Sequence, residues 1–81
     1  QNYPNPFNPS TTINYSISNA GNVELEIFSS IGEKVAVLVN EIQQPGRYSV
    51  SFDAGNLSSG VYFYKLVSGG FVSVKKMLLL R

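Results

Sequence analysis

The ionisable side chains of this chain of 81 residues offer little that could carry out a chemical reaction. Histidine and cysteine are both absent, which removes the usual general base near neutral pH, the thiolate nucleophile and zinc sites built on either residue. Acyl-transfer triads that need histidine are excluded for the same reason. The carboxylates that remain are Glu24, Glu26, Glu33, Glu41 and Asp53. The sequence therefore predicts a noncatalytic protein with no catalytic residues and no cofactor.

Two acidic segments are the remaining candidates for a metal site, in the form of weakly bound calcium. Glu24 and Glu26 would point to the same side of a strand, but calcium needs six or more oxygen ligands, so neighbouring loops would have to supply the rest. We interpret the pair as a solvated face that keeps a sheet edge soluble. The segment 53–56, Asp-Ala-Gly-Asn, raises the same question, and we interpret it as a turn capped by Asp53 or Asn56. The sequence thus predicts a fold that forms without metal.

The cationic residues are few and mostly far apart: Lys34, Arg47, Lys65, Lys75, Lys76 and Arg81. Electrostatic binding to nucleic acid needs several cations acting together, and the formal net charge is only +1. No apolar run reaches the roughly 18 residues of a membrane-spanning helix. We therefore expect neither a nucleic-acid partner nor a membrane span.

Three of the lysines lie in the most apolar part of the chain. In the last predicted strand Lys75 shares a face with Met77 and Lys76 shares the other with Leu78, so either register leaves apolar side chains outside. Lys65 lies in the preceding strand, which has the same property. An apolar surface dotted with lysines is suited to docking on another protein. The alternative is a small domain that simply exposes some apolar surface.

Alternating apolar and polar residues predict a series of short strands and no helix. We expect strands over 13–17, 23–27, 35–39, 48–53, 61–68 and 71–80. We expect turns at 29–32, 45–46, 56–60 and 69–70. The last is a pair of glycines, which is a strong hairpin signal because both residues tolerate positive φ. The pattern predicts one all-β domain, an antiparallel immunoglobulin-like β-sandwich of about six or seven strands.

The first ten residues carry three prolines, at Pro4, Pro6 and Pro9. Each fixes its own φ and pushes the residue before it away from the helical region. We therefore expect a rigid extended strap over 1–10 that leads into a sandwich over 11–81. Asn5 precedes a proline and favours a turn, whereas Phe7 is the one large apolar side chain that the strap could bury in the core.

Several blocks, in this order, resemble the type A C-terminal sorting domain of the type IX secretion system of Bacteroidetes and their relatives. The strap and the strand after it resemble the family's opening. Residues 27–35 resemble its strand, turn and glycine before a valine-rich strand, residues 57–66 its G-x-Y block, and residues 73–81 its closing strand with lysines before an apolar run. Two positions depart from the family pattern: Ser29 stands where an acidic residue is frequent, and Phe52 where tryptophan is. Ser29 can still bind the turn backbone, and Phe52 fills most of the same volume.

The resemblance implies a noncatalytic secretion signal, attached after a cargo domain and exported through the periplasm to the cell surface or the medium. Its partners would be the type IX machinery and a cell-surface cysteine sortase that removes the domain just before the strap. The residues that match the family's recognition blocks are Gly60, Tyr62, Lys65, Lys75 and Lys76. The strap would be a structural latch or a recognition epitope at the cargo junction. Because the chain starts with glutamine rather than methionine, we expect it to be a segment of a longer precursor. We also expect it to be monomeric or weakly self-associating.

Two other functions remain open at this point. One is a structural immunoglobulin-like spacer or assembly module, similar to the domain of flagellar hook-cap scaffolds; such a module can be internal, whereas a sorting domain must be at the C-terminus. The other is a carbohydrate-binding module of a secreted glycoside hydrolase, which would present a flat row of aromatic rings. Tyr62 and Tyr64, with Tyr15 or Tyr48 nearby, are the best candidates for such a row.

Overall fold

A computed structural model describes residues 2–3 and 9–80, and every strand in this part of the chain pairs antiparallel. The strands are β1 (Asn2–Tyr3), β2 (Ser10–Ile17), β3 (Gly21–Ser29), β4 (Lys34–Gln43), β5 (Gly46–Asp53), β6 (Gly60–Ser68) and β7 (Phe71–Leu79). The described residues contain no helix, and so none that could cross a bilayer.

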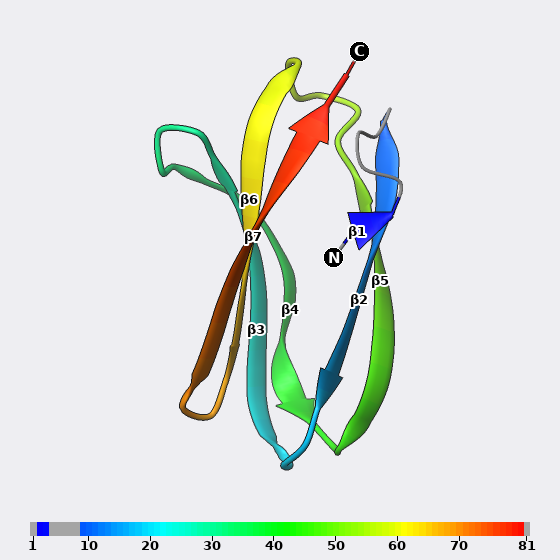
Figure 1. Cartoon of the computed structure of the whole chain (residues 1–81), viewed down its shortest axis with the longest axis vertical. Coiled ribbons are helices and arrows are strands. Elements are labelled where there is room, and N and C mark those ends of the chain that lie inside the picture. Colours follow the sequence, from blue (N-terminus) through cyan, green and yellow to red (C-terminus); the bar gives the residue numbers. More distant parts are fainter. Residues whose placement is uncertain (1, 4–8, 81) are drawn as a thin grey trace.

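The strands form two layers. One sheet has the order β1-β2-β5 and the other has the order β4-β3-β6-β7. Figure 1 shows β3, β6 and β7 on the left and β1, β2 and β5 on the right. This arrangement confirms the predicted all-β sandwich, and the strand order is that of an immunoglobulin-like domain, with the chain crossing between the layers after β2, β4 and β5.

The core is formed by the side chains that face inward from both layers. Period-two alternation places Val23, Leu25 and Ile27 on the inner face of β3, and all three are fully buried. Phe52 is also buried, so the phenylalanine fills the core position as expected. The buried hydrophobic residues are Ile13, Ile17, Val23, Leu25, Ile27, Val39, Phe52, Ala54, Tyr62, Tyr64, Leu66, Met77 and Leu79.

Two predicted hairpins are confirmed. β6 and β7 join at Gly69-Gly70, where Gly69 has a φ of 60° and uses the conformational freedom that only glycine has at low cost. β3 and β4 join at a turn in which the amide of Gly32 donates to the carbonyl of Ser29 over 3.0 Å. The Ser29 hydroxyl accepts from the amide of Glu33 over 3.2 Å. Serine therefore supports this turn, as the sequence predicted.

The structure corrects two details of the predicted sheet. β4 continues to Gln43, whereas the sequence predicted a strand ending at Val39. Polar residues interrupt the apolar run after Val39, but the inward side chain of Gln43 is buried and accepts a hydrogen bond from the Tyr15 hydroxyl over 2.8 Å. The second correction concerns β3, which lies between β4 and β6. Glu24 and Glu26 therefore protect no sheet edge.

The described part of the predicted strap begins with β1, which pairs antiparallel with β2, Asn2 opposite Ile13 and Tyr3 opposite Thr12. Pro9 is exposed, and its carbonyl accepts a hydrogen bond from the Ala54 amide over 2.9 Å. The other predicted strap residues, Pro4, Asn5, Pro6 and Phe7, lie outside the described residues.

Candidate functional site

One residue of the acidic pair on β3, Glu26, is engaged by a cation of the protein. A carboxylate oxygen of Glu26 lies 2.9 Å from the Lys34 ammonium nitrogen, and the Glu26 side chain is only 15% exposed. On the same face, Glu24 is opposite Val67 of β6 and Asn40 of β4. Within residues 2–3 and 9–80 no three acidic side chains come together in a way that could hold a metal ion.

The segment after β5 is the capped turn that the sequence predicted. The Asp53 carboxylate accepts a hydrogen bond from the Gly55 amide over 2.9 Å, and the Leu57 amide donates to the Ala54 carbonyl over 3.0 Å. The Asp53 carboxylate therefore caps the turn by accepting a hydrogen bond from its backbone.

The structure overturns the tyrosine row required by a carbohydrate-binding module. Tyr62 and Tyr64 are only 6% and 4% exposed, because they point into the core from β6. Tyr15 and Tyr48 stack on each other with ring centroids 5.4 Å apart, and they too pack against the core. The tyrosine rings are thus used to fill the sandwich, and no exposed aromatic platform is built from them.

The face of the four-stranded sheet that points away from the core, which we call the outer face, carries two of the predicted recognition residues. Lys65 is opposite Glu26 of β3, and Lys76 is opposite Phe63 of β6. Opposite residues of an antiparallel pair share a face, and diagonal neighbours lie about 7–8 Å apart. Lys65 and Lys76 are such diagonal neighbours across β6 and β7.

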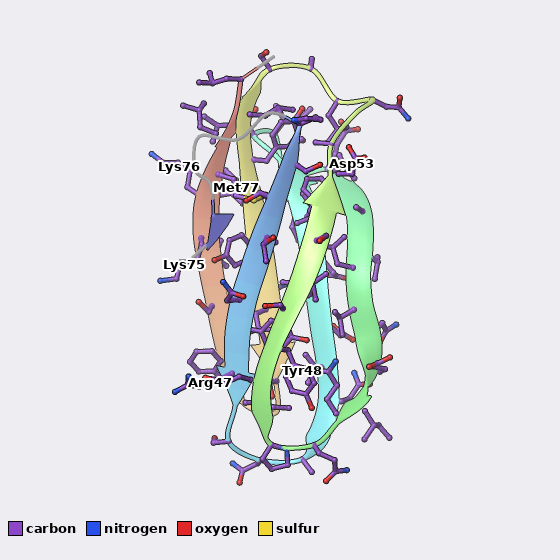
Figure 2. All side chains as sticks on the ribbon, turned by 90° about the vertical axis from the view of Figure 1, so that its right-hand side faces the viewer. Arg47, Tyr48, Asp53, Lys75, Lys76 and Met77 are labelled. Atoms are coloured by element: carbon purple, nitrogen blue, oxygen red, sulfur yellow. The ribbon has the colours of Figure 1, made fainter. Side chains whose placement is uncertain are left out.

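Lys75 lies on the opposite side of β7, at the opening between the two layers. It is opposite Tyr64 and borders a cavity of about 260 Å³. The cavity is lined by Asn14, Tyr15, Ser16, Tyr64, Leu66, Phe71, Ser73 and Lys75. Figure 2 shows the side chains of Lys75, Lys76 and Arg47 extending toward the same side of the molecule, while Met77 points inward. The three predicted lysines therefore flank one edge of the sandwich from both of its faces.

That edge is formed by β7, the end strand of its sheet. In the part of the chain that the structure describes, β7 pairs with β6 alone and with no strand on its other side. An edge strand presents backbone N–H and C=O groups to a partner. The lysines, the apolar side chains between them and this backbone edge together form the candidate recognition surface.

The two other predicted recognition residues shape this surface without belonging to it. The buried Tyr62 hydroxyl donates to the Ser58 carbonyl over 2.8 Å and so fixes the loop before β6. Gly60 starts β6 with a φ of 151°, a conformation that other residues rarely adopt, although the space around it is open. Burial keeps the Tyr62 ring from direct contact with a partner.

Arg47 is the residue near this edge that the sequence did not single out. It is opposite Ser16 of β2 in the other layer. Its sequence neighbours give no signal, because Arg47 belongs to the other layer, and only the packing of the two sheets brings its side chain to the same side of the molecule as that of Lys75.

Two inward tyrosines beside this edge predict a loss of stability at alkaline pH. Burial is the main cause that raises the pKa of Tyr15 above its ordinary value of 10.0, and burial also raises the pKa of Tyr64. The contribution of each buried, protonated tyrosine to stability is complete below the unfolded pKa of about 10. It is lost as the pH rises through the folded pKa.

We expect the free energy of unfolding to fall above pH 10, by at most about 1.4 kcal/mol per pH unit for each tyrosine that keeps its proton only in the folded state. Urea unfolding at several pH values would measure this slope. Tyr64→Phe should make the slope shallower, and an equal slope in that variant would contradict the assignment to Tyr64.

A family model for the secretion system C-terminal sorting domain matches residues 1–80. No curated protein and no solved structure matches the chain. The match covers nearly the whole chain, including β6, β7 and the residues of the candidate recognition surface.

Proposed function

Because the chain belongs to the family of type IX secretion C-terminal sorting domains, we propose that it directs an attached cargo across the outer membrane by presenting the β7 edge to the secretion machinery. The family is noncatalytic in general, and membership implies export to the cell surface or the extracellular medium. The observation that supports the proposed contact most directly is the position of β7 at the end of its sheet, where it pairs with β6 as its one neighbouring strand among the described residues and carries lysines on both of its faces.

The chemistry of this edge suits recognition by another protein. Strand addition to an exposed edge supplies main-chain hydrogen bonds, and side chains on alternate faces provide the specificity. Lys75 faces the opening between the layers and Lys76 faces outward, so a partner that pairs with β7 meets a cation on each side. Lys65 adds a third charge beside Lys76 on the outer face.

We also propose that a cell-surface cysteine sortase removes the domain after export, at a position just before the strap. β1 lies at the rim of the three-stranded sheet and pairs with two residues of β2. A cut ahead of it would leave the sandwich intact and release the cargo.

The proposed function is tested by joining residues 1–81 to the C-terminal end of a reporter with an N-terminal signal peptide, in a bacterium that has the type IX system. We expect the reporter at the cell surface or in the medium in the parent strain and in the periplasm of a strain without the outer-membrane translocon. Fractionation and protease accessibility of intact cells measure the distribution. Export that is equal in both strains, or a fusion that stays in the periplasm of the parent strain, would contradict the proposal.

A further inference from the structure

The outer face of the four-stranded sheet is largely apolar, and the described residues provide no layer that covers it. Val72 and Val74 are 56% and 57% exposed on β7, and Val37 is 52% exposed on β4. Phe28 and Phe63 lie between these strands on the same face. An exposed apolar sheet face of this kind marks an interaction site.

The charges on this face have a pattern that is complementary to itself. The pairing register places four residues in a row across the sheet: Val37 on β4, Glu26 on β3, Lys65 on β6 and Val74 on β7. Across the face the row therefore reads apolar, acidic, basic, apolar. When the row is laid over a reversed copy of itself, the acidic residue of each row meets the basic residue of the other, and each apolar residue meets an apolar residue.

We propose that the outer face binds the outer face of a second copy of this chain. The two copies are related by a two-fold axis that lies in the plane of the contact, parallel to the strands and in front of the boundary between β3 and β6. Rotation by half a turn about this axis lays β3 of each copy over β6 of the other. Glu26 of each copy then faces Lys65 of the other, and Val37 faces Val74. A two-fold contact of this kind is isologous, so each favourable pair occurs twice.

The next row supports the same arrangement. It consists of Lys34, Phe28, Phe63 and Lys76, and the rotation places Phe28 of one copy over Phe63 of the other. At the ends of this row Lys34 of one copy faces Lys76 of the other at the rim of the contact. Their repulsion is reduced by salt and by Glu26 of the same copy, which lies 2.9 Å from the Lys34 ammonium nitrogen. A third row sets Glu24 over Val67, which keeps the contact weak.

The β3–β4 turn provides a second contact between the copies. Figure 1 shows this turn projecting from the four-stranded sheet on the side away from the three-stranded sheet. Register shifts between Leu25 and Glu26 and between Ile27 and Phe28 explain the bend, because bulges increase local twist. Ile31 in this turn is 79% exposed. The rotation keeps each residue at the same height along the strands. Ile31 of each copy therefore reaches the end of the other sheet at which β6 begins and β7 ends, where Leu78 is exposed.

A second copy fits this face better than an upstream cargo domain does. β1 belongs to the three-stranded sheet, so a domain joined ahead of β1 would be attached to that layer and not to the four-stranded sheet. Four strands of about nine residues give the face a plan area of about 600 Å². A standard interface buries about 800 Å² per partner, so the expected dimer is weak and concentration-dependent.

The test exchanges the central charges and measures association by sedimentation equilibrium over a range of concentrations. We expect the unchanged chain to dimerise, and Glu26→Lys and Lys65→Glu each to weaken self-association at least about tenfold, because like charges then face each other twice. A mixture of the two variants should form a heterodimer with nearly the original affinity, because position 26 of each copy again faces a residue of opposite charge at position 65 of the other. Effects within one copy cannot produce this recovery.

Lys75→Glu is the matched control, since it makes the same charge change on the other side of β7 and should leave association unchanged. Ile31→Ser should weaken association, and circular dichroism melts should show that every variant folds. A chain that stays monomeric up to about 1 mM, or variants that do not associate when mixed, would overturn the proposal. The dimer proposal and the sorting proposal can fail independently, because association is measured on the purified chain and sorting is measured in cells.

Discussion

A domain in which Lys65, Lys75 and Lys76 are all replaced by glutamine is expected to stay folded and to leave most of its cargo in the periplasm. Lys75 and Lys76 are exposed and Lys65 is half-buried. Lysine charges that reach solvent contribute little to stability, whereas three charges at a docking surface are together worth about 1.5–3 kcal/mol, or about 10–100-fold in affinity. The measurement is the fraction of a fused reporter at the cell surface, compared with the unchanged domain. A melt of the purified variant separates loss of recognition from loss of folding.

The matched control for this prediction keeps the charges. Replacing the same three lysines by arginine should preserve export, because arginine carries the same charge on a side chain of similar length. If the glutamine variant folds and still reaches the surface at the normal level, these lysines are not the signal. Removal of residues 75–81 is a less specific test, because it also deletes part of β7 and with it the buried Met77 and Leu79. If the whole domain can be removed without changing localisation, the structural-spacer function replaces the sorting function.

Phe7→Ala is expected to lower the free energy of unfolding by about 3–5 kcal/mol, which is the usual cost of truncating a buried phenylalanine. The expectation comes from the sequence, in which Phe7 is the one large apolar side chain of a proline-rich strap. For a domain of this size the loss corresponds to a fall in melting temperature of more than about 10 °C. Thermal unfolding followed by circular dichroism measures it.

Phe71→Ala is the control for the same chemical change at an exposed position. Phe71 is 58% exposed, so its truncation should cost about 1 kcal/mol or less. A Phe7→Ala variant that melts like the Phe71→Ala variant would show that Phe7 is not a core residue. The strap would then be a linker between the cargo and the sandwich.

The local pattern of residues was enough to predict the strands and much of the core. Alternation of apolar and polar residues located the strands that contain Leu25, Tyr64 and Met77, because the side-chain period of a strand is fixed by its geometry. The glycines at 69 and 70 fixed the last hairpin. The absence of histidine and cysteine removed most catalytic chemistry, and the order of the sequence blocks identified the family that the comparison of residues 1–80 confirms.

The neighbours of each strand and the covered faces of each sheet follow from long-range packing, which the local pattern does not contain. Alternation states that Lys65 and Phe63 share a face, but it does not state that Glu26 of another strand lies beside them, since that pairing is long-range. For the same reason the sequence placed Glu26 at an edge, whereas the sheet order places β3 in the interior and β7 at the edge. Tyr62 could equally have been an exposed recognition residue, and the second layer of the sandwich makes it part of the core.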